Sequence, residues 1–285
     1  MIAQNFDYAA PGNLQEALSL LGNENAKVLA GGMSLIPLMK LRLASPEQLV
    51  DLGRIKELNY IKEDAGVLRI GATTTHFQIE SSPVVRSRCP LLAEAASYIG
   101  DLQVRNMGTI GGSIAHADPA ADYPASLFAL EAKVSLVNAK GKRELPVADF
   151  FVDTFTTALE PGEIIREVIV PVEEQSTGTS YQKMLQPASG FAIVGVAARI
   201  RKSGGKIAMT RVGVTGLSGT PYRAANVEKA IEGTAGTADD IRKAVADIAK
   251  GLDPNSDLHA SAAYRTQMAR VYATRALTVA ISRAS

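Results

Sequence analysis

Two glycine-containing segments constrain this chain more than any other feature of its sequence. The longer one, GTIGGSIAHADPAADYP (108–124), joins a glycine pair to two aspartates that stand four residues apart, and it holds few bulky side chains. The shorter one, AGGMSLIPLMK (30–40), follows a short apolar run and also begins with a glycine pair. Segments of this composition pack poorly by themselves. We therefore expect both to form walls of one binding site.

The glycine pairs indicate what such a site binds. Successive glycines let backbone N–H groups approach a ligand because no Cβ stands in the way. The first pair lies between an expected strand at 27–30 and an expected helix that Ser34 caps. N–H groups at the start of a helix attract anions, and the second pair offers a further nest of N–H groups. Two facing nests fit a diphosphate better than a single phosphate. The alternative is that each pair only forms a tight turn.

Several common functional classes are excluded by the sequence. Neither segment carries G-x-G-x-x-G, and G-x-x-x-x-G-K-[ST] is absent, so the chain is not a Rossmann dinucleotide binder or a P-loop enzyme. A formal net charge of +1 gives no reason to expect nucleic acid or an anionic membrane as partner. No apolar run approaches the roughly 20 residues of a spanning helix, and no export signal is visible at the N-terminus. We therefore expect a cytoplasmic protein.

Metal binding and side-chain catalysis are not indicated. A single cysteine excludes an internal disulfide and any iron–sulfur cluster held by this chain's own thiolates. His116 and Asp118 form an H-x-D pair, but no further ligands have metal-like spacing. Asp118 and Asp122 stand four apart, yet no nucleophile or histidine base stands at a distance that would indicate catalysis. We interpret Asp122 as an acceptor for ribose or ribityl hydroxyls; the alternative is that it caps the following helix.

The periodicity of the chain predicts an α+β protein. Asn13 and Glu16 resemble a capping box that opens a helix reaching Leu21, and mixed strands and helices continue to about 171. The pattern then changes to three successive strands followed by helices, which is typical of a separate α+β unit. These strands are expected at 179–185, 191–201 and 206–216, and the helices at 224–232, 238–250 and 261–283. We place the domain boundary in the polar stretch 173–178.

Four motifs in order identify a resemblance. AGGMSLIPLMK, QVRNMGTIGGSIAHADPAADYP, GEIIREVIVP and YQKMLQPASGFAIVGVAA resemble the FAD-binding medium subunits of the molybdenum hydroxylase (xanthine oxidase) family, of the carbon monoxide dehydrogenase type. The resemblance implies a two-lobed FAD-binding domain of the vanillyl-alcohol-oxidase (PCMH) type at 1–175, with the lobes divided near 55–60. It further implies a small α+β domain at 178–285, with a three-stranded antiparallel sheet and helices.

The resemblance also implies which residues hold the FAD. The Ala30–Leu35 and Thr109–Ser113 loops would wrap its diphosphate, Asp122 matches an acid that contacts FAD, and Ile165 and Lys183 match positions beside the cofactor. Phe191 falls where some relatives place a tyrosine against the isoalloxazine. The complete set expected to bind the cofactor is Ala30, Gly31, Gly32, Met33, Ser34, Leu35, Thr109, Ile110, Gly111, Gly112, Ser113, Asp122, Ile165, Lys183 and Phe191.

Two of these positions depart from the carbon monoxide enzymes. Met33 stands where those enzymes usually have histidine, and Phe191 replaces their tyrosine within a QPASGFA segment closer to heterocycle-oxidising relatives. Both weaken a specific assignment to carbon monoxide. Neither affects the glycine pairs, so FAD remains the expected cofactor.

The function implied by the resemblance is electron relay. A large subunit with a molybdenum cofactor would oxidise the substrate, and a small subunit with two [2Fe-2S] clusters would pass electrons to FAD on this chain, in a dimer of heterotrimers. The FAD would deliver them to an external acceptor such as oxygen, a quinone or NAD. Two alternatives stay open: a free-standing flavin reductase of the same superfamily, and a flavin-free scaffold that keeps only the fold.

Overall fold

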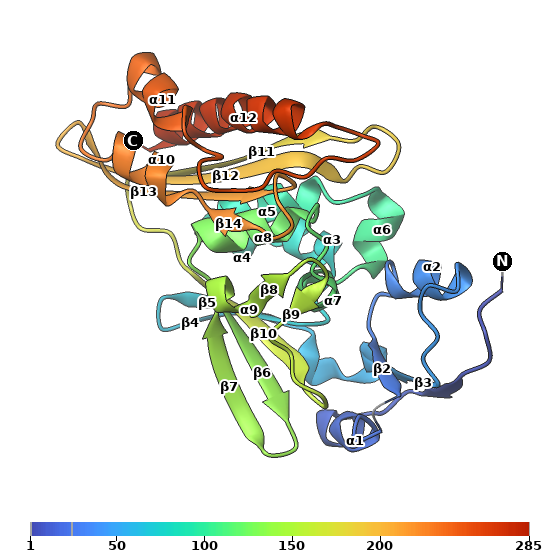
Figure 1. The fold of residues 1–285 in the computed structure, drawn as a ribbon. Helices are drawn as coiled ribbons and strands as arrows, with labels where there is room; N and C mark the ends of the chain where they lie inside the picture. The colour runs from blue at the N-terminus through green and yellow to red at the C-terminus, as the bar shows by residue number, and fades with distance from the viewer. Residues whose placement is uncertain (1, 24, 285) are drawn as a thin grey trace.

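The computed structural model describes residues 2–23 and 25–284, and its first layer is a small parallel sheet. This sheet has the strand order β1-β3-β2, in which both pairs are parallel. Parallel neighbours need crossover connections, and two short helices supply them here. The bounds are β1 Asp7–Ala9, α1 Leu14–Leu20, β2 Ala26–Leu29, α2 Leu35–Lys40 and β3 Gln48–Asp51. Figure 1 shows this part of the chain in blue, at the N-terminal end of the molecule.

The helix α1 begins as the sequence predicts, but only half of the capping box forms. The side chain of Asn13 accepts from the N–H of Glu16 at 2.9 Å. The carboxylate of Glu16 instead accepts from the N–H of Gly12 at 2.9 Å. Glu16 therefore connects Gly12, the residue before the N-cap Asn13, to the first turn of the helix.

A second, five-stranded antiparallel sheet lies next in the chain, with the order β4-β5-β10-β6-β7. Two 3₁₀ turns, η1 Leu52–Arg54 and η2 Lys56–Leu58, lead into it. Its strands are β4 Ile61–Asp64, β5 Val67–Gly71, β6 Lys133–Asn138, β7 Gly141–Pro146 and β10 Ile164–Pro171. A hairpin of β8 Phe151–Asp153 and β9 Thr156–Thr157 follows the short helix α9 Val147–Phe150.

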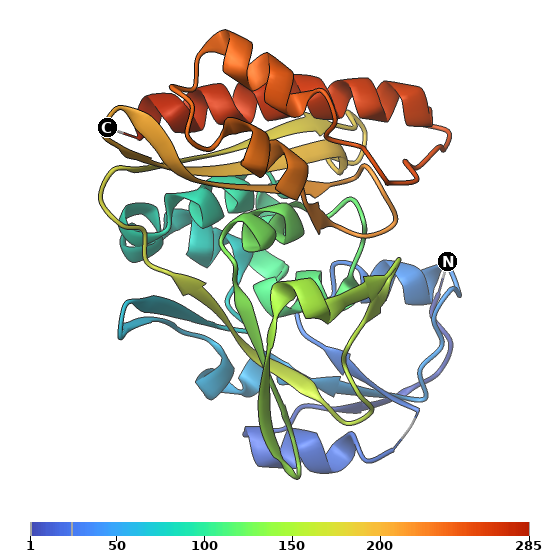
Figure 2. The same cartoon turned by 60° about the vertical axis from the view of Figure 1, so that its left-hand side comes forward.

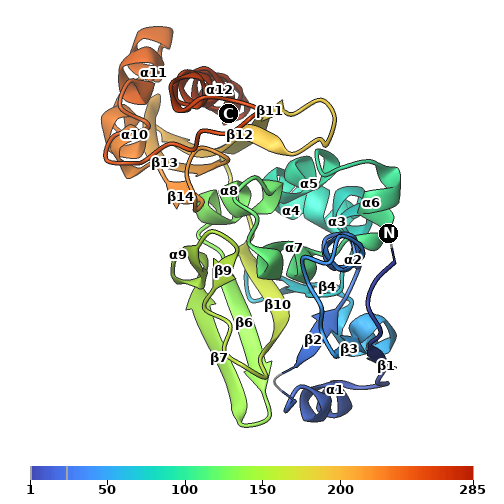
Figure 3. The same ribbon diagram turned by 45° about the vertical axis from the view of Figure 1, so that its right-hand side comes forward.

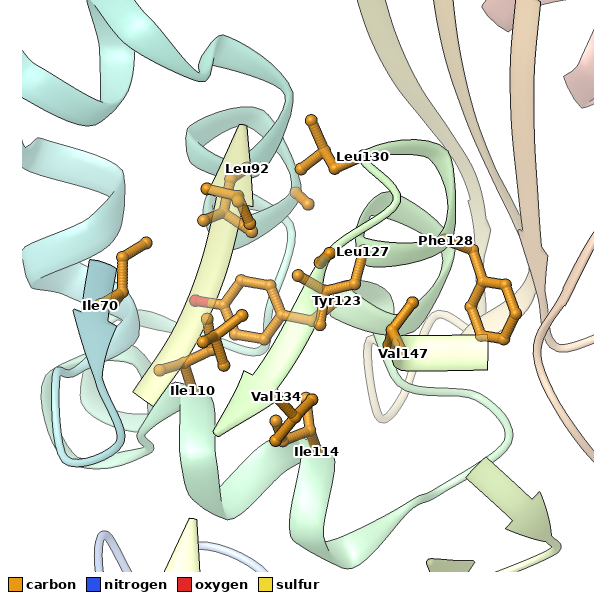
Figure 4. Packing of buried hydrophobic residues seen from close by; sticks show 14 of the residues in the cluster. Ile70, Leu92, Ile110, Ile114, Tyr123, Leu127, Phe128, Leu130, Val134 and Val147 are labelled. Atoms are coloured by element: carbon orange, nitrogen blue, oxygen red, sulfur yellow. The ribbon is translucent and has the colours of Figure 1, made fainter. Parts of the chain in front are cut away.

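Six helices lie between β5 and β6 in the chain, and all of them except α6 contribute buried residues to the core on the inner face of this sheet. They are α3 His76–Ser81, α4 Pro83–Arg88, α5 Pro90–Ser97, α6 Leu102–Met107, α7 Ile110–His116 and α8 Asp122–Ala129. Ile70 of the sheet, Leu92 of α5, Ile110 of α7 and Tyr123 of α8 are all fully buried together (Figure 4). The sequence analysis misses α4, α6 and α7. For α7 the reason is clear: its glycines lower helix propensity, and packing against the sheet outweighs that cost.

The third layer is an antiparallel sheet of the order β11-β12-β13-β14. Its elements are β11 Thr177–Leu185, β12 Ala192–Ser203, β13 Lys206–Thr215 and β14 Tyr222–Arg223, followed by α10 Ala225–Ile231, α11 Ala238–Val245 and α12 Ala262–Arg283. The sequence predicts only the first three strands. The prediction is wrong on β14 because two residues at a sheet edge carry no periodic signal. Figures 1 and 2 show α12 lying across one face of this sheet, while α5 and α8 lie beneath the other.

Close backbone contacts join the third sheet to α12 on one face and to α8 on the other. A Cβ added at Gly178 would lie 2.0 Å from the carbonyl oxygen of Ala280 in α12. On the other face, a Cβ at Gly213 would lie 1.9 Å from the carbonyl oxygen of Ala125 in α8. Distances this short leave room for hydrogen only. The helix α8 therefore belongs to the packing of both the second and the third sheet.

This contact makes a stability prediction. Gly213→Ala must push α8 and β13 apart, so we expect it to lower the free energy of unfolding by about 1–3 kcal/mol, the usual cost of overpacking. The matched control is Gly12→Ala, where the added Cβ would meet only a glutamate oxygen at 3.9 Å. Urea unfolding of both variants measures the difference. Equal stability of the two variants would show that α8 and β13 do not depend on this contact.

Candidate cofactor site

The two glycine segments meet in the folded chain. A Cβ added at Gly31 would lie 2.0 Å from the carbonyl oxygen of Met107 and 2.8 Å from the Cα of Gly108. The first segment thus runs directly against the residues that precede Thr109. Both segments lead into a helix, α2 and α7, whose places are seen in Figure 3. The sequence prediction that the segments form walls of one site is therefore consistent with their positions.

The first segment carries free backbone donors. The N–H groups of residues 31–34 donate to no acceptor among the described residues. Gly32 has φ +74°, a conformation that glycine adopts without strain. Ser34 precedes α2, but its side chain makes no capping hydrogen bond, which leaves the hydroxyl available as well. This stretch is a set of donors suited to an anionic group.

The second segment differs from the expected nest of free N–H groups. The N–H of Ile110 donates to the carbonyl of Thr74 at 3.1 Å, and that of Gly111 to the carbonyl of Ala72 at 2.9 Å. The hydroxyl of Thr109 accepts from the N–H of Gly112 at 3.1 Å and so caps α7. The N–H of Ser113 donates to the carbonyl of Thr109. This segment therefore contributes shape and side chains rather than a row of unbonded donors.

The glycines of the second pair have different reasons to be glycine. A Cβ at Gly111 would lie 2.6 Å from the Cβ of Ala72, so this residue is required for packing against the sheet. Gly112 is half-buried, and an added Cβ would meet only the hydroxyl of Thr109, at 2.9 Å. Gly111 is thus required by core packing, whereas the absence of a side chain at Gly112 leaves space outside the protein core.

A buried histidine packs against the backbone at the start of the second segment. A Cβ at Gly108 would lie 2.6 Å from Nε2 of His76, and Nδ1 of His76 lies 3.1 Å from the hydroxyl of Tyr123. Burial, followed by the charge of Arg105, lowers the pKa of His76 to about 4, so the ring is neutral at physiological pH. The sequence contains no signal for this role, since residues 76, 108 and 123 form no local pattern.

Asp122 and Lys183 are joined in one buried cluster. Nζ of Lys183 lies 2.9 Å from Oδ2 of Asp122, and the hydroxyl of Tyr181 donates to Oδ1 at 2.5 Å. Nζ also donates to the carbonyl of Tyr98 at 3.0 Å. The side chains of Lys183 and Asp122 are 1% and 5% exposed. Asp122 is the first residue of α8 and makes no capping bond, so the capping alternative from the sequence is wrong.

The charge of Asp122 depends on its partners. Burial raises its pKa to about 6, and Lys183 and the hydrogen bond from Tyr181 act in the opposite direction. Glu94 lies beside the cluster, where its carboxylate accepts from the N–H of Tyr181 and pairs with Arg283. The sequence analysis chose Asp122 and Lys183 but missed Tyr181, which lies two residues from Lys183 on the same face of β11.

The remaining two side chains lie in contrasting places. Ile165 of β10 is buried in the core of the second sheet, opposite Leu136 of β6. Phe191 lies just before β12 and is 45% exposed, so it is not an ordinary core aromatic. A tight turn holds it: the N–H of Gln186 donates to the carbonyl of Phe191, and the hydroxyl of Ser189 accepts from its N–H.

Nothing in the described part of the chain suggests a metal site. Residues 2–23 and 25–284 contain no group of three or more histidine, cysteine, aspartate or glutamate side chains placed to hold an ion. His116, from the H-x-D pair, packs its ring beside Phe155 with centroids 5.1 Å apart. Asp118 accepts from the N–H of Ala120 instead. Over the same residues, no helix combines the length and the apolar character that crossing a bilayer requires.

Comparisons with known proteins agree with this geometry. Residues 4–173 match the family described as FAD binding domain in molybdopterin dehydrogenase, and residues 179–280 match the CO dehydrogenase flavoprotein C-terminal domain. The chain is 43% identical to the carbon monoxide dehydrogenase medium chain of Hydrogenophaga pseudoflava, over 99% of both chains. It is 39% identical to the glyceraldehyde dehydrogenase medium chain of Sulfolobus acidocaldarius, over 97% of this chain and 98% of that one.

Solved structures show the same fold. Carbon monoxide dehydrogenase from Hydrogenophaga pseudoflava superposes with a TM-score of 0.96 at 44% identity, covering 99% of each chain. Quinoline 2-oxidoreductase from Pseudomonas putida 86 gives 0.95 at 31% identity, covering 100% of this chain and 99% of that one. The protein is thus a flavoprotein of the molybdenum hydroxylases. It belongs to the family of FAD-binding medium subunits of molybdopterin dehydrogenases, which confirms the resemblance found in the sequence.

The buried pair makes a second prediction. Lys183→Met leaves Asp122 without its counter-charge, and breaking such a pair costs about 3–5 kcal/mol of unfolding free energy. The double variant Asp122→Asn/Lys183→Met removes both charges, so we expect it to be more stable than Lys183→Met alone. Urea unfolding of the two single variants and the double variant completes the cycle. Strictly additive losses would show that the two side chains are not coupled.

The same variant should depend on pH. A carboxyl whose pKa is raised in the folded state binds its proton more tightly there than in the unfolded state. The ionised form therefore lowers the free energy of unfolding above that pKa. This loss disappears as the pH falls below it. The loss in Lys183→Met should therefore be largest near pH 8 and should shrink toward about pH 5. A loss that stays constant over this range would mean that Asp122 is not the titrating group.

Proposed function

We propose that this chain is the electron-transfer subunit of a molybdenum, iron–sulfur and flavin dehydrogenase. It would take electrons from the [2Fe-2S] clusters of a partner subunit and pass them through FAD to an external acceptor. The observation that carries this proposal is the row of unbonded N–H groups at residues 31–34, placed against the start of the second glycine segment. The names of similar proteins, among them medium chains of carbon monoxide and glyceraldehyde dehydrogenases, support it.

The residues fit FAD in a specific way. The N–H groups of residues 31–34 and the hydroxyl of Ser34 would bind the diphosphate, because these donors lack partners. Thr109, Gly112 and Ser113 would form the opposite wall. When bound, FAD supplies the ability to accept electrons singly or in pairs. The chain itself contributes orientation, neutral surroundings and control of solvent access.

The buried cluster would keep the charge near the cofactor balanced. Asp122 and Lys183 form a neutral pair, and Tyr181 holds the carboxylate in place. The remaining oxygen lone pairs of Asp122 would accept from ribityl hydroxyls. Phe191, exposed in its turn, would lie against the isoalloxazine ring, and Ile165 would approach it from the apolar core.

The wider organisation is proposed on the same grounds. Residues 1–175 would form the FAD domain, divided into lobes near 55–60, and 178–285 the domain that covers the cofactor. A molybdenum-bearing large subunit and an iron–sulfur small subunit would complete a dimer of heterotrimers in the cytoplasm. Exposed apolar side chains on and near α2 and α6 suit a lasting subunit interface: Ile36, Leu41, Leu102 and Met107.

The cofactor assignment makes a third prediction. The purified chain should hold one FAD without a covalent bond, and acid precipitation should release all of it. Gly112→Val should lose FAD while keeping the fold, because the Cβ that it adds would contact only the hydroxyl of Thr109 among the described residues. Gly12→Val, at an open surface position, is the matched control. Flavin absorbance after desalting gives occupancy, and circular dichroism gives folding. Full occupancy in Gly112→Val would remove this glycine from the site, and a colourless wild-type protein would favour the scaffold alternative.

The division of labour makes a fourth prediction. The chain alone should show at most weak transfer from NADH to an artificial acceptor, because the described residues contain no evident acid/base pair or metal cluster for activating an organic substrate. Oxidation of carbon monoxide, an aldehyde or an N-heterocycle should require the molybdenum and iron–sulfur subunits. Turnover assays of the chain alone and of the reconstituted complex test this. Steady oxidation of such a substrate by the chain alone would favour the free-standing enzyme.

A further inference from the structure

The outer face of the five-stranded sheet carries a groove that the cofactor site does not use. The groove has a volume of about 830 Å³ and runs from η2 across the sheet to β7. The opposite face of the same sheet is the one covered by helices and core residues such as Ile70 and Val134. The strand β10 bulges between Ile165 and Glu167, and Arg166 in the bulge lines the groove.

The groove has a strong excess of positive charge. Six basic side chains line it against three carboxylates, which leaves three positive charges there, whereas the whole chain carries +1. Two of the carboxylates are already engaged: Glu167 accepts from Tyr60 and Arg69, and Glu57 accepts from the N–H of Leu14. The third is Glu144.

Four of the basic side chains have no ionic partner. Arg69 and Arg143 pair with carboxylates of the chain. Lys56, Lys62, Lys142 and Arg166 take part in no salt bridge among the described residues. Cations without a salt-bridge partner on η2 and on the strands β4, β10 and β7 raise the local concentration of anions and favour an acidic partner.

The shape favours an extended chain. Lys62 stands on β4 and Lys142 on β7, at the two edges of a five-stranded sheet. Strands are about 4.8 Å apart, so the groove crosses about 19 Å, the length of about six extended residues. Small-molecule sites are mostly apolar and enclosed. This groove is lined by charged and polar side chains and has no large aliphatic residue.

We propose that this groove binds an acidic segment of a separate protein that associates transiently with the chain. A permanent subunit would be expected to bury an apolar surface, which this face lacks. Nucleic acid is disfavoured by the net charge of +1 and by the presence of only one aromatic side chain, Tyr60, in the lining. The inference is independent of which cofactor the chain carries.

The test uses a fluorescently labelled hexaglutamate peptide and the full-length, FAD-loaded protein. Fluorescence anisotropy should show binding that weakens at least about tenfold between low and high salt, near 50 and 300 mM. Lys62→Glu/Lys142→Glu/Arg166→Glu should abolish it. The matched control is Lys202→Glu/Lys206→Glu/Lys229→Glu, which makes the same charge change on the other domain and should leave binding unchanged. Single changes of the groove residues to glutamine, each expected to weaken binding a few-fold, cover the case in which the triple variant misfolds.

Four results would overturn the proposal. The first is absence of peptide binding, and the second is an equal loss of peptide binding in both triple variants. The third is groove-dependent binding of phosphatidylserine vesicles or of an oligonucleotide that is stronger than binding of the peptide. The fourth is loss of peptide binding at the groove when the other subunits are added. The last result would mean that a permanent subunit already covers the groove. Binding that survives assembly and is lost only with the groove variants supports a transient acidic partner.

Discussion

The helix α8 is the element on which the rest of the structure depends. Tyr123 on α8 is buried in the core of the second sheet, and the backbone at Ala125 touches Gly213 of the third. The segment before α8 is held in the same way: the hydroxyl of Thr215 lies 2.8 Å from the carbonyl oxygens of both Pro119 and Ala121 and donates its one hydrogen to either of them. Since α7 and α8 are joined by this segment, the position of the second glycine segment is tied to both the second and the third sheet.

The buried pair at the start of α8 has an energetic cost as well as a role. Removing two charges from water is expensive, and a buried ion pair is often no more stable than apolar residues of the same volume. Asp122 and Lys183 are nevertheless nearly inaccessible, and the hydroxyl of Tyr181 and the carbonyl of Tyr98 add further hydrogen bonds to the pair. Such a cluster accepts one arrangement of α8 against β11 and penalises others. It therefore favours one orientation of the third sheet relative to α8, which the proposed cofactor site would require.

Local patterns in the sequence predict much of this fold, but they do not predict its long-range contacts. Hydrophobic periodicity located the three long strands of the last sheet, and Asn13 marked the start of α1. The helix α7 was missed because its glycines read as a loop. The glycine pairs pointed to a site, but Gly31 and Gly111 are glycines because backbone atoms of Met107 and Ala72 lie against them. The pairing of Asp122 with Lys183 joins residues 61 positions apart, and no local pattern reveals it.

The two side chains that depart from the carbon monoxide enzymes, Met33 and Phe191, are both accessible in the structure. Met33 and Phe191 are 39% and 45% exposed, so neither is needed for the core. Each lacks the hydrogen-bonding group that the histidine or tyrosine of those enzymes would provide. Met33 adjoins the unbonded N–H groups of the first segment, and Phe191 is held by its turn with the ring accessible. Contacts with a flavin at these two positions would therefore be made by packing alone, while the backbone donors would provide the polar contacts.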